Sequence, residues 1–405
     1  DVLTPSELGE QLYDAIANID EHQCFELIEG GADTNFRKLR AEEENLSHSG
    51  GIEPKSMLDR DWTCLHLAVD CNVLSVVSLL LENGAHIDSK DQKGNTPLHW
   101  ACLKGRFDCV DEILKYNSNN NNDSSTSCIS IQNNEGLTPL HLACLSGYTT
   151  IVEKLINSNA SLDVLTVKGW NPLHYACFYG QNECFGYLLN QGVDVNSSDL
   201  NQNTPLHKSI IRGSLDIVKF LISSDADPNQ VDSIGETCLH KAIISNQNDI
   251  ILYLLSNCEN DVNSETVFGN TALHYSVFQN NLSLSRCLIT NGWDINHKTG
   301  LGNTPLMTAV RNVKKIGKKP YNYKEDSVLN IIKMLLERNA DVGLTNAKGE
   351  TVFHIAAELG NKSCLNLLFE FSHHVKLITM DVQTPLHHAA RGNSLDCLNI
   401  LLNRG

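Results

Sequence analysis

Apolar and polar positions recur in one fixed order along most of the chain. The stretch NTPLHWACLKG from Asn95 returns as LTPLHLACLSG from Leu137 and as WNPLHYACFYG from Trp170. Leucine, alanine and cysteine keep their places inside this polar frame. Residues that recur in register in this way behave as core positions, so the pattern predicts a repeated structural unit with a buried apolar side.

The residues at the edges of the motif predict where helices begin and end. Threonine can cap a helix whose first turn tolerates proline, so a first helix is expected between Thr96 and Gly105. Glycine or asparagine stands nine positions after the threonine in nearly every copy, where a left-handed residue ends the helix. A second helix with a leucine pair, such as Leu188 and Leu189, follows and closes on a turn such as GVDVN from Gly192. Each unit is therefore a helical hairpin plus a turn, too thin to bury its own apolar face, and stacking supplies the core.

The motif threonine gives the period. Ten copies stand in register, at Thr63, Thr96, Thr138, Asn171, Thr204, Thr237, Thr271, Thr304, Thr351 and Thr384. Six of the nine intervals between them are 33 residues, and T-P-L-H-x-A at this period is the signature of ankyrin repeats. Over nearly its whole length the chain resembles the ankyrin-repeat family. The resemblance implies an all-α solenoid of helix-turn-helix units with β-turn tips, which binds proteins along a concave face formed by the turn tips and first helices.

The repeats are expected to form one solenoid of about 11 units over residues 1–405. Residues 1–35 form a degenerate capping repeat whose origin aligns with Glu10, while Leu12 and Ala15 take the motif's leucine and alanine places. Loop insertions are expected at residues 36–60, 116–130 and 311–326. The sequence ends in mid-repeat without a cap, so we expect it to be a fragment of a longer protein.

Composition narrows the class of partner and the compartment. A formal net charge of −17 argues against binding to a nucleic-acid backbone, which requires clustered Lys and Arg. No apolar run approaches the roughly 20 residues that span a bilayer. The 14 cysteines include no C-x-x-C pair, and many recur at motif positions, so we expect reduced, buried thiols in a cytoplasmic, monomeric protein.

The recurring histidine raises the question of chemistry. Nine of the 16 histidines occupy one motif position, and stacking separates successive copies by about 10 Å, too far to share a metal ion. We therefore expect them to tie each turn to its neighbour through hydrogen bonds. Catalytic and nucleotide-binding motifs are missing from the sequence, and His373-His374 is more typical of a surface pair than of a metal site. No catalytic residue, metal or cofactor is predicted, and the protein is not expected to be an enzyme.

A partner-binding surface is predicted from the resemblance. In the family, the exposed and variable positions are the residue before the motif threonine and the fourth, seventh and eighth after it. Aromatic and basic residues are concentrated there in Trp62, Trp100, Trp170, Tyr175, Phe178, Tyr179, Lys208, Arg212, Lys241, Tyr275 and Phe278. Exposed aromatic clusters are typical of interfaces. The alternative, that fourth-position residues such as Trp100 and Tyr175 are half-buried packing residues, remains open.

The sequence thus favours a non-enzymatic scaffold or adaptor that binds proteins on its concave face. The alternative is a recognition or regulatory arm of a larger multidomain enzyme or channel. Two insertions suggest regulation. Residues Ser124 to Ser127 are candidate phosphorylation sites, and the basic residues between Arg311 and Lys319 could dock an acidic segment or an anionic membrane.

Overall fold

The computed structural model describes residues 3–38, 61–120, 128–316, 325–372 and 383–404. Regular secondary structure in this part of the chain is helical, apart from one antiparallel β-bridge between Arg37 and Thr63. The predicted all-α class is therefore confirmed. Two compact units are present, Asp1–Ala226 and Asp227–Gly405, and a single continuous solenoid stays a prediction.

Unit 1 consists of helical pairs that follow one another along the chain. Its helices are α1 (Pro5–Ala17), α2 (Glu21–Glu29), α3 (Cys64–Cys71), α4 (Leu74–Glu82), α5 (Pro97–Lys104), α6 (Phe107–Asn120), α7 (Pro139–Ser146), α8 (Thr149–Asn157), α9 (Pro172–Tyr179), α10 (Asn182–Asn190), α11 (Pro205–Arg212) and α12 (Leu215–Ser223), with the short 3-10 helix η1 (Cys128–Ser130) between α6 and α7.

Unit 2 continues the same alternation. Its helices are α13 (Cys238–Ile244), α14 (Asn248–Asn257), α15 (Ala272–Phe278), α16 (Leu282–Thr290), α17 (Pro305–Ile316), α18 (Glu325–Glu337), α19 (Val352–Glu358), α20 (Lys362–Phe371), α21 (Pro385–Arg391) and α22 (Leu395–Asn403). The described residues of both units together hold 22 α-helices, which is the 11 pairs that the period predicts.

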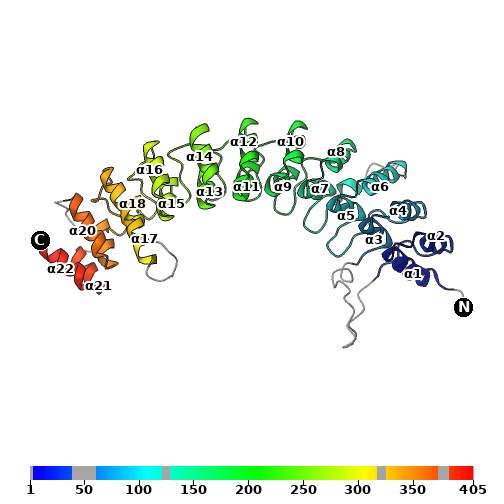
Figure 1. The fold of residues 1–405 in the computed structure, drawn as a ribbon, viewed down its shortest axis with the longest axis horizontal. Helices are drawn as coiled ribbons and strands as arrows, with labels where there is room; N and C mark the ends of the chain where they lie inside the picture. The colour runs from blue at the N-terminus through cyan, green and yellow to red at the C-terminus, as the bar shows by residue number, and fades with distance from the viewer. Residues whose placement is uncertain (1–2, 39–60, 121–127, 317–324, 373–382, 405) are drawn as a thin grey trace, which may run out of the picture. The chain divides into compact units, whose positions relative to one another are not determined.

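Within each unit the helices form two layers (Figure 1). The odd-numbered helix opens each repeat and packs on the next odd-numbered one, as α5 does on α7, while α4 packs on α6 in the other layer. We call the surface of the odd-numbered helices, with the turns before them, the first-helix face, and that of the even-numbered helices the second-helix face. The core lies between the layers, where Leu98 and Ala101 of α5 and Ile113 of α6 are fully buried.

The predicted start and stop signals are confirmed. Thr96 caps α5 with its backbone in the extended region, and Gly105 ends the helix in the left-handed region at a φ of 72°. Glycines two positions before the threonine also have positive φ. At Gly136 a Cβ would lie 2.8 Å from the backbone nitrogen of Val167 in the next turn. Glycine is thus needed both for the turn and for the close approach of adjacent turns.

One helix begins earlier than predicted. Helix α1 begins at Pro5 rather than after Glu10, because Thr4 and Glu7 form a capping box six residues earlier. Leu12 and Ala15 are nonetheless buried as expected.

The insertions are also less loop-like than expected. Helix α6 continues to Asn120, and the side chains of Cys128 and Ile129 in η1 are buried, so a loop over all of 116–130 is wrong. In the third insertion, Arg311 lies in α17 and Glu325 already belongs to α18. Residues 39–60, 121–127 and 317–324, with Ser124 to Ser127, Lys318 and Lys319, lie outside the described residues.

Candidate functional site

The buried motif histidines link adjacent repeats. His99 Nδ1 lies 2.8 Å from Thr96 Oγ1, and its Nε2 lies 3.0 Å from the backbone carbonyl oxygen of Leu137 in the next repeat. The same pair of contacts is made by His66, His141, His174, His274 and His354. Burial lowers the pKa of His99 to about 4, so the ring is neutral near pH 7. The predicted structural role is confirmed for these six histidines. His240 keeps the contact to Thr237, but its buried Nε2 has no partner among the described residues, and His387 is exposed.

A polar side chain five positions before the motif threonine organises each turn. In unit 1, Asp199 Oδ1 accepts hydrogen bonds from the backbone N–H groups of Asn201 and Asn203, both at 2.8 Å. Its other oxygen, Oδ2, accepts from Lys208 Nζ at 2.6 Å and from Trp170 Nε1 at 3.0 Å. Burial raises the pKa of Asp199, but Lys208 and the two backbone N–H groups outweigh it and hold the pKa below its ordinary value. Asp199 therefore connects the turn to two side chains of the first-helix face.

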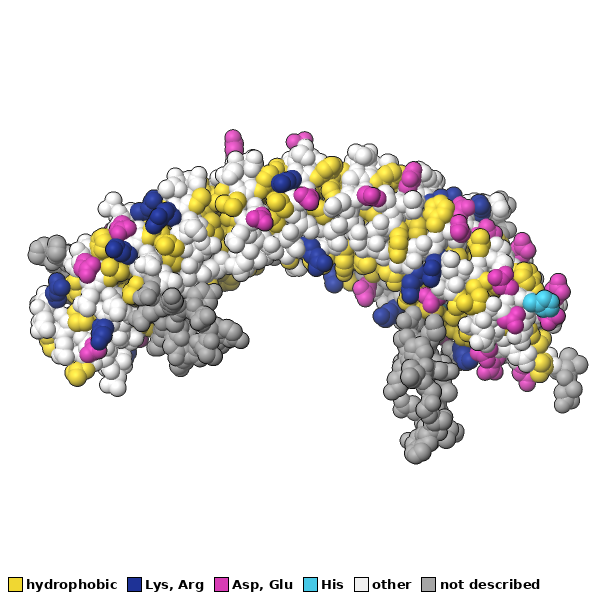
Figure 2. All heavy atoms as spheres, viewed as in Figure 1, with side chains coloured by type: hydrophobic (Ala, Val, Ile, Leu, Met, Phe, Trp, Pro, Cys, Tyr) yellow, Lys and Arg dark blue, Asp and Glu magenta, His cyan; other side chains and the backbone are white. Residues whose placement is uncertain are grey.

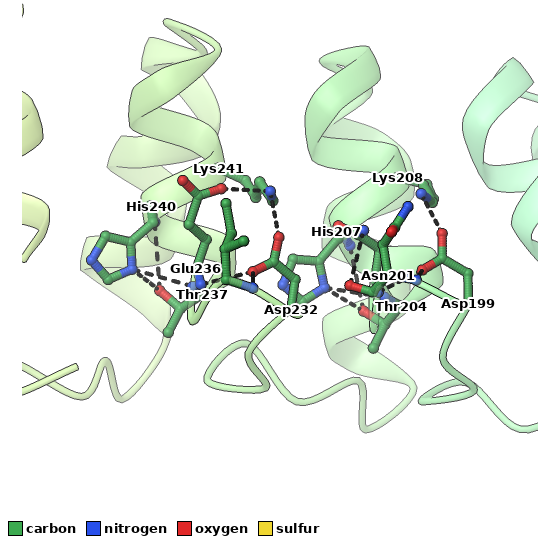
Figure 3. A network of polar contacts seen from close by, with 12 residues as sticks. Asp199, Asn201, Thr204, His207, Lys208, Asp232, Glu236, Thr237, His240 and Lys241 are labelled. Carbon is green, nitrogen blue, oxygen red and sulfur yellow. Dashed lines mark hydrogen bonds and ion pairs between the residues drawn. The ribbon is translucent and has the colours of Figure 1, made fainter. Parts of the chain in front are cut away.

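Unit 2 contains a second network of the same design, which is also drawn in Figure 3. Asp232 Oδ1 accepts from the backbone N–H groups of Ile234 and Glu236, and Oδ2 lies 2.6 Å from Lys241 Nζ. Lys241 Nζ also lies 2.5 Å from Glu236 Oε2, while Tyr275 donates its hydroxyl to Glu236 Oε1 at 3.1 Å. The ammonium group is thus held between two carboxylates.

A sequence signal for these networks was missed. Aspartate stands at the turn position only as Asp91, Asp199 and Asp232 among the described copies from Thr96 onward, and the residue nine positions later is then Trp100, Lys208 or Lys241. All three have an N–H group that reaches the carboxylate. In the other five described copies the turn residue is Asn or Thr, and the later residue is Leu142, Tyr175, Tyr275, Thr308 or Ile355. In these copies the turn residue is a charged aspartate only where a Trp or Lys stands nine positions later.

Four predicted site residues of unit 1 form one group, which we call the aromatic cluster: Trp170, Tyr175, Phe178 and Tyr179. The Trp170 ring centroid lies 5.0 Å from that of Tyr175 and 5.3 Å from that of Phe178. Phe178 and Tyr179 meet edge to face, with their centroids 5.3 Å apart. Tyr175 is buried, Trp170 and Phe178 are half-buried, and Tyr179 is 43% exposed. The cluster thus has a buried base and an exposed edge.

Lys208 is not the exposed cation that the sequence predicts. Its Nζ lies 4.6 Å from the centroid of the Trp170 ring as well as 2.6 Å from Asp199 Oδ2, and its side chain is buried. The Lys208 ammonium is therefore occupied by Asp199 and the Trp170 ring, and it helps to hold the aromatic cluster in place. Arg212 on the same helix is exposed as expected, and Lys241 of unit 2 is half-buried.

Trp62 and Trp100 also differ from exposed binding residues. Trp62 is only 1% exposed and its ring meets that of Trp100 edge to face, with the centroids 4.9 Å apart. The half-buried Trp100 donates Nε1–H to Asp91 Oδ2 at 2.9 Å. The expectation that Trp62 is exposed is therefore wrong: its ring packs against those of Trp100 and His66. For Trp100 and Tyr175, the packing alternative describes the structure better.

In unit 2, Tyr275 and Phe278 lie at a pocket of about 540 Å³ on the first-helix face. It is lined by Glu236, Ile244, Asn270, His274, Tyr275, Phe278, Gln279 and Thr308. Phe278 and Ile244 expose apolar surface, while the Glu236 carboxylate supplies a polar edge. The pocket thus combines an apolar wall with one acidic group.

Charge is distributed unevenly over unit 1. Its first helical pair contains Glu and Asp but neither Lys nor Arg, and Figure 2 shows magenta acidic side chains gathered at this end of the chain.

All 14 cysteines are free thiols. A helix long and apolar enough to cross a membrane is not found among the described residues. One group of possible metal ligands occurs in the described part, Glu350, Glu358 and His388, whereas His373 and His374 lie outside it.

Comparison with known proteins matches these repeats to one family. The family model described as ankyrin repeats matches residues 12–125, 120–199, 191–266, 256–318 and 323–405. A protein named as an ankyrin repeat protein of fowlpox virus (strain NVSL) is 31% identical over 91 residues, which is 22% of this chain and 18% of that protein. Another so named, from Rickettsia bellii (strain RML369-C), is 33% identical over 75 residues, or 18% of this chain. This chain covers 36% of the second protein's length, so both matches span only part of the relatives.

Proposed function

The chain belongs to the ankyrin-repeat family, and on that premise we propose that it is a non-enzymatic scaffold that binds a partner protein on its first-helix face. Ankyrin repeats are generally protein–protein interaction modules. The aromatic cluster at Trp170, Tyr175, Phe178 and Tyr179 is the proposed anchor in unit 1, and the exposed Arg212 lies on α11, the helix that packs on α9. In unit 2 the pocket at Tyr275 and Phe278 is a second contact region.

One observation carries this proposal, the exposed edge of the aromatic cluster on a rigid base. Trp170 is fixed by its hydrogen bond to Asp199 and by the Lys208 ammonium over its ring. Tyr175 is buried beneath, so Phe178 and Tyr179 are presented with little freedom to lose on binding. Aromatic side chains that are rigid before binding are the residues in which interfaces concentrate affinity.

A second function is kept as an alternative, in which the repeats are the recognition or regulatory arm of a larger enzyme or channel. The partial coverage of both relatives motivates it, because those proteins extend well beyond the matched repeats. The same face would then bind a segment of its own parent chain.

Site-specific cross-linking distinguishes these cases. A photoreactive phenylalanine analogue is introduced at Tyr179, and a matched control places it at Phe220 of the second-helix face, which is also 43% exposed. The scaffold proposal expects a cross-link from position 179 to a separate protein and none of the same kind from position 220. A link from 179 to a peptide of the same parent chain favours the alternative. Equal labelling from both positions contradicts a binding role for the cluster.

A further inference from the structure

Three positions meet repeatedly on the first-helix face: the residue before the motif threonine, the seventh after it, and the fourth of the next repeat. In unit 1 they hold Trp170, Phe178 and Lys208, which are in contact. In the last repeats of unit 2 they hold Glu350, Glu358 and His388. Each of these three offers one ligand atom, and the three atoms lie within 4.8 Å of one another.

The spacing of these donors suits a metal ion. His388 Nδ1 and Glu358 Oε2 are 3.3 Å apart, which is long for a charge-assisted hydrogen bond. Two ligands at about 2.0–2.1 Å from a tetrahedral zinc ion are about 3.3 Å apart. The Glu350 donor has to move by no more than about 1.5 Å to join them at that spacing, a shift within reach of a rotation about its side-chain bonds.

Neighbouring side chains hold the potential ligands in place. Glu350 Oε2 accepts from Asn346 Nδ2 at 2.8 Å and from the Arg311 guanidinium at 3.2 Å. Both contacts are to one oxygen, Oε2. Such outer hydrogen bonds orient the carboxylates of metal sites. The His354 and His388 rings meet edge to face, with their centroids 5.1 Å apart. Both ring nitrogens of His354 are hydrogen-bonded, to Thr351 and to Gln383, so His354 borders the site without being a ligand.

The two carboxylates of this group have different partners. Arg311 pairs with Glu350, whereas Glu358 faces the imidazole of His388, which is charged only if it is protonated. His388 and Glu350 are buried, whereas the Glu358 side chain is 38% exposed and leaves a path from solvent. A divalent cation would supply a permanent positive charge beside Glu358, and imidazole with carboxylate is a donor set that suits zinc and its neighbours.

We propose that Glu350, Glu358 and His388 bind a divalent transition-metal ion, with zinc as the best fit and with water completing the coordination. This site is independent of the binding proposed for the aromatic cluster. In unit 2 it would hold α19 and α21 together through residues of both repeats.

Calorimetric titration of the metal-free full chain with Zn²⁺ tests the proposal. We expect one site of micromolar or tighter affinity, a raised melting temperature, and, with Co²⁺ as the probe, the visible absorption of a four-coordinate ion. The Glu358→Gln variant, which keeps the shape of a half-exposed side chain, should weaken binding at least about tenfold, since even an outer partner of a ligand is worth roughly 10–100-fold.

Matched variants separate this site from other histidines. Glu265→Gln disrupts a histidine–carboxylate pair of the same unit, in which His297 Nε2 lies 2.7 Å from Glu265 Oε2, and should leave zinc binding unchanged. A His373→Ala/His374→Ala double variant should also leave it unchanged. The proposal is overturned if the chain binds no zinc, or if binding survives Glu358→Gln and His388→Gln. In either case the three residues form only a hydrogen-bonded network.

Discussion

Lys208 Nζ lies 2.6 Å from Asp199 Oδ2, and both side chains are withdrawn from solvent, at 8% and 1% exposure. The pair joins α11, the last first-layer helix of unit 1, to the turn before it, at a position where the sequence predicts an exposed cation. Because Lys208 also covers the Trp170 ring and Asp199 also accepts from Trp170 Nε1, the ion pair determines the position of the aromatic cluster.

Removing one partner of this pair should destabilise unit 1 strongly. Lys208→Leu leaves the buried Asp199 carboxylate without its counter-ion, which typically costs about 3–5 kcal/mol. The double variant Asp199→Asn/Lys208→Leu reproduces the combination Asn133 and Leu142 that another repeat already uses. It should recover most of the loss. Urea denaturation of the single and double variants measures this, and an additive double variant would show that the two residues are not coupled.

The tryptophans and Tyr179 should differ in their effect on folding. Trp62→Ala empties a fully buried site and should cost about 3–5 kcal/mol, like the core control Leu173→Ala at about 2–5 kcal/mol. Trp170→Ala loses a hydrogen bond to a carboxylate, worth about 1.5–3 kcal/mol. Tyr179→Ala, at the exposed edge, should stay within about 0.5 kcal/mol. Thermal melting of the four variants gives the order directly, and a Tyr179→Ala loss equal to that of Trp62→Ala would contradict the exposed-edge interpretation.

Stability should fall as the pH drops below the ordinary histidine pKa. Burial lowers the pKa from 6.5 to about 4 in six motif histidines: His66, His99, His141, His174, His240 and His274. These rings stay neutral in the fold while the unfolded chain takes up protons. The stability they contribute is therefore fully present above pH 6.5 and is lost as the pH falls toward 4. In that window each histidine lowers the free energy of unfolding by roughly 1.4 kcal/mol for every pH unit that the pH falls.

The melting temperature measured across this window checks the prediction. A His99→Gln variant, compared with the unchanged chain, should show a shallower dependence on pH, because one titrating ring has been removed. A melting temperature that is flat between about pH 7 and about pH 5 would mean that the motif rings are charged or accessible in the fold.

The fold was predictable because its signals are local. The Thr96 cap, the left-handed Gly105 and the Leu98 core position are determined within one repeat, and the period multiplies them. Exposure on the first-helix face was less predictable, because it depends on side chains from neighbouring repeats. Trp62 is covered by Trp100, from the following repeat, and Lys208 is drawn in by Asp199 and Trp170.

Part of this information was nevertheless present in the sequence. Aspartate nine residues before Trp100, Lys208 and Lys241 signals a side chain at those positions that donates to the aspartate and is drawn out of full exposure. The grouping of Glu350, Glu358 and His388 was not predicted, because it joins three different positions of two repeats. Only the register of stacking brings these positions together.

The central claim is that the exposed edge of the aromatic cluster binds the partner, and one comparison of affinities tests it most directly. The dissociation constant of the cross-linked partner is measured by calorimetry for the unchanged chain, for Tyr179→Ala and for Phe220→Ala, whose side chain is equally exposed at 43% on the second-helix face. The account predicts that Tyr179→Ala costs about 2 kcal/mol or more of binding, over tenfold in affinity, with an unchanged melting temperature. It predicts no change for Phe220→Ala. Equal affinity for both variants, or a loss confined to Phe220→Ala, would contradict it.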